Sequence, residues 1–427
     1  MRISWPVPVA IILCAFGISM AENPDIKLSP SGFAYYQIGQ IVQMTPNDGS
    51  LIEKAFDQHF NGRLTLNATV KERLKIGVGV EFEYGADLAN FKKKPLYMLK
   101  EAYGSYSFGN PENSFLQITS GYFPFKYNPQ TSNLGEYLFR SGAYPPYVIT
   151  DFDFAKARLM GFNVSSRLSD ELFNVSSLLF NELRFNLLFT SEYGEPPFFD
   201  YSLSFVAGYT FLKKMIDIGG GINFNRIIPI DPDETTFPSN FVTDLNNEYV
   251  IKNNGDTLLY TKKGVKLMGR FTFDMKPILP FRDIFGSEDG KIYGEMAILG
   301  VKNYGSYFPE RKERMPMMLG FNIPCFKIID LVSFELEYYE VASGVKYDRP
   351  AVSTSPFPEV YTGSSRTFYK WSFFGQKTIV KGLAIKGLIG RDHFRSMTSV
   401  AGGTYDNIER MNGPGDWHYK LRIMYSF

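Results

Sequence analysis

The sequence predicts an all-β chain that forms a closed, antiparallel, up-and-down transmembrane β-barrel of about 16 strands, with long extracellular loops and short periplasmic turns. Three observations lead to this prediction. Apolar and polar residues alternate with a period of two along the whole chain, long and short connections alternate between the segments, and the N-terminus has the features of a secretory signal peptide. The net charge of +1 provides no long-range field for nucleic acid, so a nucleic-acid partner is not expected.

The first element in chain order is residues 1–21. Arg2 supplies a positive charge, residues 3–18 are uncharged and largely apolar, and Ser19 and Ala21 are small residues at positions −3 and −1 of a cleavage site. The apolar run is short for a spanning helix, which needs about 20 residues. We therefore expect residues 1–21 to be a cleaved signal peptide and residues 22–427 to be a single barrel. Cys325 is then the one exported cysteine, so no disulfide would hold the fold.

The strands follow from alternation. In residues 63–71, apolar Leu64, Leu66, Ala68 and Val70 alternate with polar residues, and residues 74–84 repeat the pattern after a tight turn at 72–73. The same reasoning gives strands at 33–43, 62–71, 73–84, 98–109, 114–123, 155–168, 181–191, 200–212, 215–226, 262–275, 290–302, 315–324, 329–341, 366–375, 379–391 and 415–427. Each is close to the ~9–11 residues that a tilted membrane strand needs.

The connections form a second pattern. The long ones are 44–61, 85–97, 124–154, 227–261, 342–365 and 392–414, and the short ones are 72–73, 110–113, 213–214, 325–328 and 376–378. Two connections, 169–180 and 276–289, are longer than a tight turn and break the rule. A soluble β-sandwich has no reason to keep every second connection short, whereas an outer-membrane barrel does. With an exported start and an even strand count, the C-terminus lies in the periplasm and the long loops lie at the cell surface.

In a barrel the apolar strand face meets lipid and the polar face meets the interior, the reverse of a soluble sandwich. Alternation alone does not separate these two folds. Aromatic residues near strand ends favour the barrel, because aromatic girdles form at membrane interfaces; examples are Tyr84, Tyr201, Phe211, Trp417 and Phe427.

The last eleven residues, 417–427, resemble the terminal strand of Gram-negative outer-membrane barrels, with alternating apolar residues and a final Phe. This resemblance implies an outer-membrane location, lipid contact, and an assembly signal at Tyr425 and Phe427 that the barrel assembly machinery recognises. In plan the exported chain is similar to the sixteen-stranded porins. Residues 121–127 weakly resemble the strand-to-loop step of phosphate-selective-type porins, but the usual basic residues are only partly present and phosphate selectivity is not implied.

A barrel of sixteen to eighteen strands leaves an aqueous channel, so the strand count favours passive diffusion of small hydrophilic solutes or ions. The loop 124–154 occupies the position that folds inward and narrows the channel in general porins, and residues 133–140 have the pattern of a short helix between polar and glycine breaks. Its aromatic residues either offer stacking surfaces for sugars or pack the loop as a plug.

Charged side chains at a constriction determine selectivity. The positive candidates are Arg63, Lys75, Arg140, Arg184, Lys266, Arg270, Lys370 and Arg422, and the negative candidates are Glu81, Glu83, Glu136, Asp151, Asp153, Asp217, Glu335 and Glu337. For each residue the alternative is a role in wall solvation or in an ion pair that leaves conductance unchanged.

Catalysis has little support. The histidines His59, His393 and His418 lie on different predicted elements, and no nucleophile motif, phosphate loop or metal-ligand spacing accompanies them. We expect no enzyme activity, no metal and no cofactor. The competing function is a non-transporting surface barrel, such as an adhesin, whose loops near 227–261 and 342–365 bind a partner. The sequence leaves open whether copies assemble as a homotrimer.

Overall fold

The structure is a computed structural model. It describes residues 26–43, 54, 56–86, 93–109, 114–139, 149–151, 154–170, 179–191, 200–229, 249–251, 257–259, 264–280, 282–298, 300–301, 311–341, 345–346, 359–360, 366–391, 399–400, 404–405 and 415–427. The predicted signal peptide lies outside these residues and stays a prediction. Within the described ranges, no helix has the length and apolar character needed to cross a membrane.

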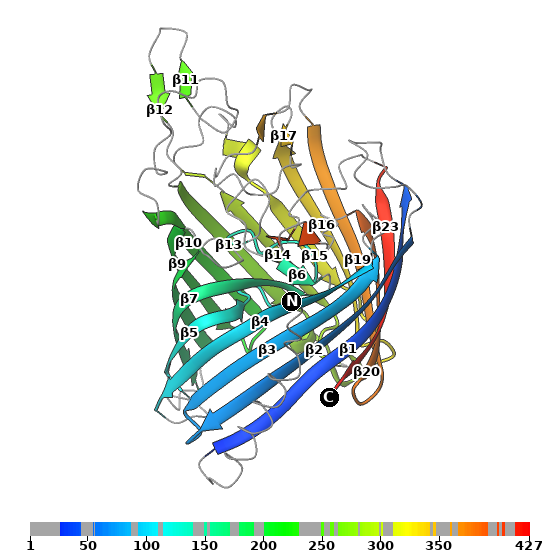
Figure 1. Cartoon of the computed structure of the whole chain (residues 1–427). Helices are drawn as coiled ribbons and strands as arrows, with labels where there is room; N and C mark the ends of the chain where they lie inside the picture. The colour runs from blue at the N-terminus through cyan, green and yellow to red at the C-terminus, as the bar shows by residue number, and fades with distance from the viewer. Residues whose placement is uncertain are drawn as a thin grey trace, which may run out of the picture.

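Sixteen long antiparallel strands form the wall of a closed barrel, as the sequence predicts (Figure 1). They are β1 (Ile26–Gln43), β2 (Phe56–Val70), β3 (Leu74–Ala86), β4 (Lys93–Phe108), β5 (Leu116–Phe125), β7 (Phe154–Ser169), β8 (Glu182–Ser191), β9 (Asp200–Phe211), β10 (Ile216–Pro229), β13 (Gly264–Asp274), β14 (Lys291–Ile298), β15 (Met317–Asn322), β16 (Leu331–Val341), β19 (Arg366–Val380), β20 (Leu383–Arg391) and β23 (Trp417–Ser426).

Short strands and 3₁₀ helices lie outside the sixteen wall strands. Strand β6 (Ile149–Asp151) pairs with β7, and three small hairpins pair β11 (Tyr249–Ile251) with β12 (Thr257–Leu259), β17 (Val345–Lys346) with β18 (Glu359–Val360), and β21 (Ser399–Val400) with β22 (Thr404–Tyr405). The described residues also include the short 3₁₀ helices η3 (Lys276–Ile278), η4 (Arg282–Ile284) and η5 (Arg311–Arg314). Figure 1 shows β11, β12 and β17 at the end of the barrel opposite the C-terminus.

The barrel closes where the first strand meets the last. Strand β1 pairs with β2 on one side and with β23 on the other, and Phe33 lies opposite Ser426 in the closing pair. The final residue joins this ladder, because Gly32 N–H donates to the Phe427 carbonyl (3.1 Å) and Phe427 N–H donates to the Gly32 carbonyl (3.0 Å). Each of the sixteen described wall strands thus has a neighbour on both sides, which matters because lipid cannot satisfy unpaired backbone groups.

Each of the sixteen predicted strands corresponds to one observed strand, with several ends displaced: β2 begins at Phe56 rather than at 62, β4 at Lys93 rather than at 98, and β20 at Leu383 rather than at 379. Strand β1 begins at Ile26 rather than at residue 33, because Ser29, Pro30 and Gly32 hide its alternation. Strand β19 continues through the predicted turn 376–378 to Val380. The chain reverses instead at Gly382, whose φ of 87° suits glycine.

The turn between β2 and β3 is tight. Lys71 and Glu72 both have positive φ (46° and 60°), and Arg73 N–H donates to the Val70 carbonyl (3.1 Å). Two consecutive positive φ angles match the twist of antiparallel strands and keep the hairpin short.

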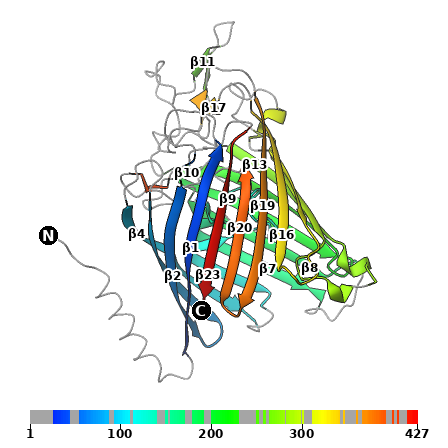
Figure 2. The same ribbon diagram turned by 90° about the vertical axis from the view of Figure 1, so that its right-hand side faces the viewer.

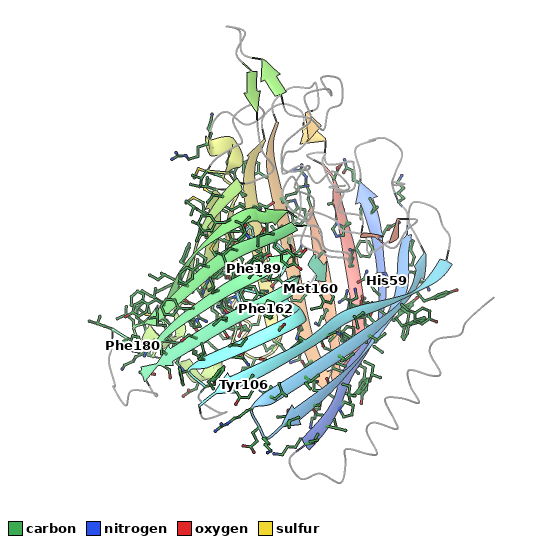
Figure 3. All side chains as sticks on the ribbon, turned by 60° about the vertical axis from the view of Figure 1, so that its left-hand side comes forward. His59, Tyr106, Met160, Phe162, Phe180 and Phe189 are labelled. Carbon is green, nitrogen blue, oxygen red and sulfur yellow. The ribbon has the colours of Figure 1, made fainter. Side chains whose placement is uncertain are left out.

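The two faces of each strand differ as the barrel requires. On β3, Ile76, Val78 and Val80 are exposed on the outside, whereas Gly77, Gly79 and Glu81 on the inside are buried. The same holds on β7, where Met160 and Phe162 are exposed and Asn163 is buried. Figure 3 labels Met160, Phe162 and Tyr106 on the wall that faces the viewer. An apolar outer wall and a polar inner wall are typical of a transmembrane barrel.

Candidate functional site: an inward loop anchored to one wall

The main apolar cluster of the described chain lies inside the barrel. Residues 126–139, which follow β5, contribute Tyr127, Leu134, Tyr137, Leu138 and Phe139 to it. The wall contributes residues from β5, β7, β8, β9, β13, β14 and β15, namely Phe123, Leu159, Leu188, Val206, Met268, Tyr293, Ala297 and Met318. We call residues 126–139 the inner loop. Because its apolar side chains pack against these strands, the inner loop is held to one side of the barrel.

The inner loop is not helical, so the prediction of a short helix at 133–140 is wrong for the described part of that segment. Gly135 and Glu136 have positive φ (86° and 61°), which a right-handed helix does not allow. Gly135 is also close to the wall, because a Cβ there would lie 3.2 Å from Glu295 Oε2. This backbone turns its N–H groups towards the wall instead of pairing them within a helix.

Glu335 on β16 accepts hydrogen bonds from three consecutive backbone N–H groups of the inner loop. Its carboxylate receives Ser132 N–H (2.5 Å), Asn133 N–H (2.9 Å) and Leu134 N–H (2.7 Å). The hydroxyl of Tyr293 on β14 donates to the same carboxylate (2.9 Å). A carboxylate with several such donors is well satisfied although it is buried.

Glu295 on β14 is a second anchor. It accepts Glu136 N–H (3.0 Å) and Tyr137 N–H (2.8 Å) from the inner-loop backbone. It also accepts the Tyr127 hydroxyl (2.5 Å) and the Asn128 amide (3.0 Å). Two wall carboxylates therefore bind five backbone N–H groups of one loop.

The Glu136 carboxylate stabilises the loop from within. It accepts Asn128 N–H (2.7 Å) and Tyr127 N–H (3.4 Å). Burial, followed by the nearby charge of Glu295, raises the pKa of Glu136 from its ordinary value of 4.5 to about 8, against the opposing effects of Lys126 and these hydrogen bonds. Burial also raises the pKa of Tyr127 well above its usual 10.0.

Further contacts extend the anchoring to β13 and β19. Tyr137 donates its hydroxyl to Glu337 (2.8 Å), and Lys266 Nζ donates to the Leu138 carbonyl (3.3 Å). Asn133 donates its amide to Ser372 Oγ on β19 (3.2 Å). Four predicted site residues that are far apart in sequence thus all bind the inner loop: Glu136, Lys266, Glu335 and Glu337.

A second group of candidates forms ion pairs on β2, β3 and β4. Arg63 lies 2.8 Å from Glu101, and Lys100 lies 3.2 Å from Glu81. Lys100 and Glu101 are adjacent in sequence yet both are buried, because the β3–β4 register shifts between Gly79 and Val80. Such a bulge lets two consecutive residues face the same side, so strict alternation did not identify both.

A third group lies on β8, β10 and β13. Asp217 accepts hydrogen bonds from Arg184 Nη2 (2.7 Å) and Arg270 Nη1 (3.2 Å). Both arginine side chains pass over Gly208, because a Cβ there would lie 2.9 Å from Arg270 Nη2 and 3.3 Å from Arg184 Nη2. This glycine provides the space in which one carboxylate bridges two guanidinium groups.

The remaining candidates are distributed around the barrel. Lys75 is exposed next to the 71–73 turn, Lys370 lies opposite Glu337 in the β16–β19 register, and Arg422 contacts Gln37 and Tyr35. Glu83 and Asp151 belong to β3 and β6, but their side chains lie outside the description, as do Arg140 and Asp153 entirely. Among described residues, no group of His, Cys, Asp and Glu is arranged to hold a metal ion.

Sequence reasoning missed Glu295, Lys100 and Glu101. Glu295 lies in the predicted strand 290–302, where Gly294 and Ala297 blur the two faces, yet its position two residues after Tyr293 follows the inward alternation. Its place beside the inner loop depends on contacts across more than 150 residues, for example 158 residues to Tyr137.

The chain matches no protein-family model, and no curated protein matches its sequence. Solved structures do match in shape. The high-pH structure of OprB from Pseudomonas putida matches at 8% identity over 97% of both chains, with a TM-score of 0.51. Salmonella typhi OmpF, solved with daunomycin, matches at 11% identity over 95% of this chain and 99% of that one (TM-score 0.49), and a mutant Rh. blastica porin matches at 6% over 94% and 100% (TM-score 0.44). The similarity to OprB supports the fold alone.

Proposed function

We propose that this chain, which has the barrel fold of the sixteen-stranded porins, is an outer-membrane channel for passive diffusion of small hydrophilic solutes. The proposed location is the outer membrane of a Gram-negative cell, with lipid around the apolar wall and assembly through the C-terminal strand. No enzymatic step is proposed. The proposed assembly is a homotrimer, which the molecular mass of the purified protein in detergent would test.

The observation that carries this proposal is the one-sided anchoring of the inner loop. Glu295 and Glu335 bind its backbone, and its apolar side chains pack on β5 to β15, so the loop lines a wall. Elsewhere the inner wall carries buried polar side chains, such as Gln37, Asn61 and Lys386, beside a small apolar cluster of Phe374 and Leu388. Sixteen strands enclose an interior wider than side chains of one wall can fill, which favours a water-filled path.

The experiment is single-channel recording with the refolded, purified barrel in a planar bilayer. Folding is checked independently by the shift in gel mobility between unheated and boiled samples. Stable conductance steps support the channel. A folded barrel that gives no steps contradicts it and favours the competing surface-binding function, which loop deletions and a binding assay would then examine.

A further inference from the structure

The turn between β13 and β14 and the turn between β15 and β16 lie at the end of the barrel that carries the C-terminus. Backbone hydrogen bonds connect neighbouring turns at this end. Asp330 N–H, at the start of β16, donates to the Gln376 carbonyl of β19 (3.0 Å), and Ser426 N–H donates to the Gly382 carbonyl (2.7 Å). Figure 2 shows the C-terminus at the lower end of β23, next to the turn that joins β19 to β20.

Side-chain contacts hold these two turns together. The carboxylate of Asp289, which is 1% exposed, accepts Phe326 N–H (2.9 Å) from the neighbouring turn. The amide of Asn322 donates to the Glu288 carbonyl (3.0 Å), and the rings of Phe285 and Phe326 lie 5.4 Å apart between centroids. The two turns therefore form one unit, and the side chains that they expose are held in fixed positions.

This unit exposes large apolar side chains. Ile278 and Ile284 in the first turn are 63% and 50% exposed, and Phe326, Ile328 and Ile329 in the second are 51%, 73% and 37% exposed. We call these five residues the apolar rim. Single exposed apolar side chains are normal on a protein surface, but five on two joined turns indicate an interaction surface.

The opposite side of the same end is charged. The turn between β2 and β3 lies halfway around the sixteen-stranded wall, and it consists of Lys71, Glu72 and Arg73, all of them exposed. Next to the apolar rim, the β19–β20 turn exposes Ile379 (52%) and Val380 (59%). Apolar exposure is therefore concentrated on one side of this end.

The apolar rim continues the outer wall of the barrel. Before the turns, one row of apolar residues crosses five adjacent strands, each residue directly opposite the next: Phe273, Ile292, Phe321, Phe334 and Phe373. The row faces outwards, because Phe334 and Phe373 are exposed. Aromatic rows of this kind form at the edge of the lipid-facing band of a transmembrane barrel. With this row at the membrane interface, the turns just beyond it are at the depth of the lipid headgroups.

We propose that the apolar rim is a one-sided anchor that inserts into the phospholipid leaflet at the C-terminal end of the barrel. The inference rests on the proposed outer-membrane location, which makes this the periplasmic leaflet. The occupant is lipid rather than protein, because the rim continues the apolar wall that lipid covers. Apolar side chains at this depth are buried at the boundary between headgroups and acyl chains. Lys327, exposed between Phe326 and Ile328, brings an ammonium group to the depth of the lipid phosphates.

The test uses nitroxide spin labels on single cysteines of the refolded barrel, with Cys325→Ser as background, in vesicles of phosphatidylethanolamine and phosphatidylglycerol. The labels are placed by Ile328→Cys in the rim, Leu336→Cys on the exposed outer wall, and Glu72→Cys on the charged turn. Each label is compared by its accessibility to oxygen, which concentrates in lipid, and to a water-soluble nickel complex. The oxygen-to-nickel ratio at position 328 is expected to be several-fold higher than at position 72 and nearer to that at position 336.

A second variant removes the apolar side chains around the label. Ile278→Ser, Ile284→Ser and Phe326→Ser are combined with the label at position 328, and the barrel should still fold because all three side chains are exposed. Gel mobility of unheated and boiled samples checks folding. The ratio at position 328 should fall several-fold, towards that at position 72, whereas the matched control Arg73→Ser should leave it unchanged.

The outcomes separate the anchor from the proposed function. If the label at position 336 is in lipid but the label at 328 is as accessible to nickel as the one at 72, the anchor is overturned and the membrane location stands. A ratio at 328 that survives the serine substitutions also overturns the anchor. A label at 336 in water overturns the membrane location and the anchor together. Bilayer recordings without conductance steps contradict the channel alone, because lipid contact of the rim does not depend on an open path.

Discussion

The backbone nitrogen of Leu134 lies 2.7 Å from Glu335 Oε2, across 201 residues of sequence. Leu134 is the last of three consecutive residues whose N–H groups donate to this carboxylate. Together these hydrogen bonds fix the inner loop to β16. The loop backbone has no helix to satisfy these donors, so a wall carboxylate takes the place of intrahelical carbonyls. The position of the loop therefore depends on these wall carboxylates together with the apolar packing of its side chains.

Glu335→Gln should loosen the inner loop. Its amide group has one oxygen and one NH₂, so it cannot accept bonds from all of the donors that the carboxylate binds, and at least one buried N–H group loses its partner. We expect a destabilisation of the loop of about 1–3 kcal/mol, seen as noisier single-channel current and faster proteolysis of the folded barrel within the loop. Glu72→Gln, at an exposed turn, is the control; unchanged current in Glu335→Gln would contradict the anchor.

The docked loop should weaken as pH rises through about 8. The pKa of Glu136 in the folded protein is raised from 4.5 to about 8, so the docked loop holds this proton over a range in which the released loop has lost it. The contribution is complete below pH 4.5 and is lost as pH increases towards and beyond 8. Lys126, Glu295 and Tyr127 surround the group and set the midpoint.

The measurement is single-channel noise at pH 6 and pH 9.5 in the same salt. Noise should be larger at pH 9.5 in the wild type, and Glu136→Gln, which is neutral at both values, should remove the difference. Equal noise at the two values in the wild type would show that Glu136 does not titrate with loop release.

The fold could be predicted from sequence because strand alternation is a local property that each segment carries by itself. Residues 74–84 alternate in sequence and appear as β3, with Ile76 outside and Glu81 inside. The inner loop could not be predicted in the same way. Leu134 and Leu138 are buried because strands from β7 to β15 approach them, and the helix expected at 133–140 fails because Glu335 and Glu295 satisfy its backbone.

Strand alternation also predicts part of the candidate site, because it identifies which residues face the interior. Glu335 and Glu337 follow the inward period of β16, so the sequence identifies the face but not the partner. Their contacts with Leu134 and Tyr137 are long-range. The bulge at Lys100 and Glu101 interrupts the two-residue alternation of β4, and no residue type in the local sequence indicates that a bulge occurs there.

Asp217→Asn should destabilise the barrel more than an exposed ion pair would. Asp217 bridges Arg184 and Arg270, and the neutral amide would leave two guanidinium groups close together, one of them with a side chain only 3% exposed. We expect a loss of about 1–3 kcal/mol, measured as a lower midpoint in urea unfolding followed by tryptophan fluorescence. Glu72→Gln, whose partner Lys27 is exposed, should change the midpoint by less than about 1 kcal/mol. Equal shifts in the two variants would contradict the bridging role.

Deletion of Phe427 should impair closure and assembly in separable ways. The residue exchanges two backbone hydrogen bonds with Gly32 (3.0 and 3.1 Å), so its removal shortens the ladder between the first and last strands. Phe427→Ala keeps this backbone but removes the exposed terminal ring. If the ring is an assembly signal, Phe427→Ala should refold in detergent like the wild type yet reach the outer membrane of cells at a several-fold lower level. The deletion should lower the thermal midpoint in detergent as well. If Phe427→Ala reaches the membrane fraction at the wild-type level, the prediction that the ring is an assembly signal is wrong.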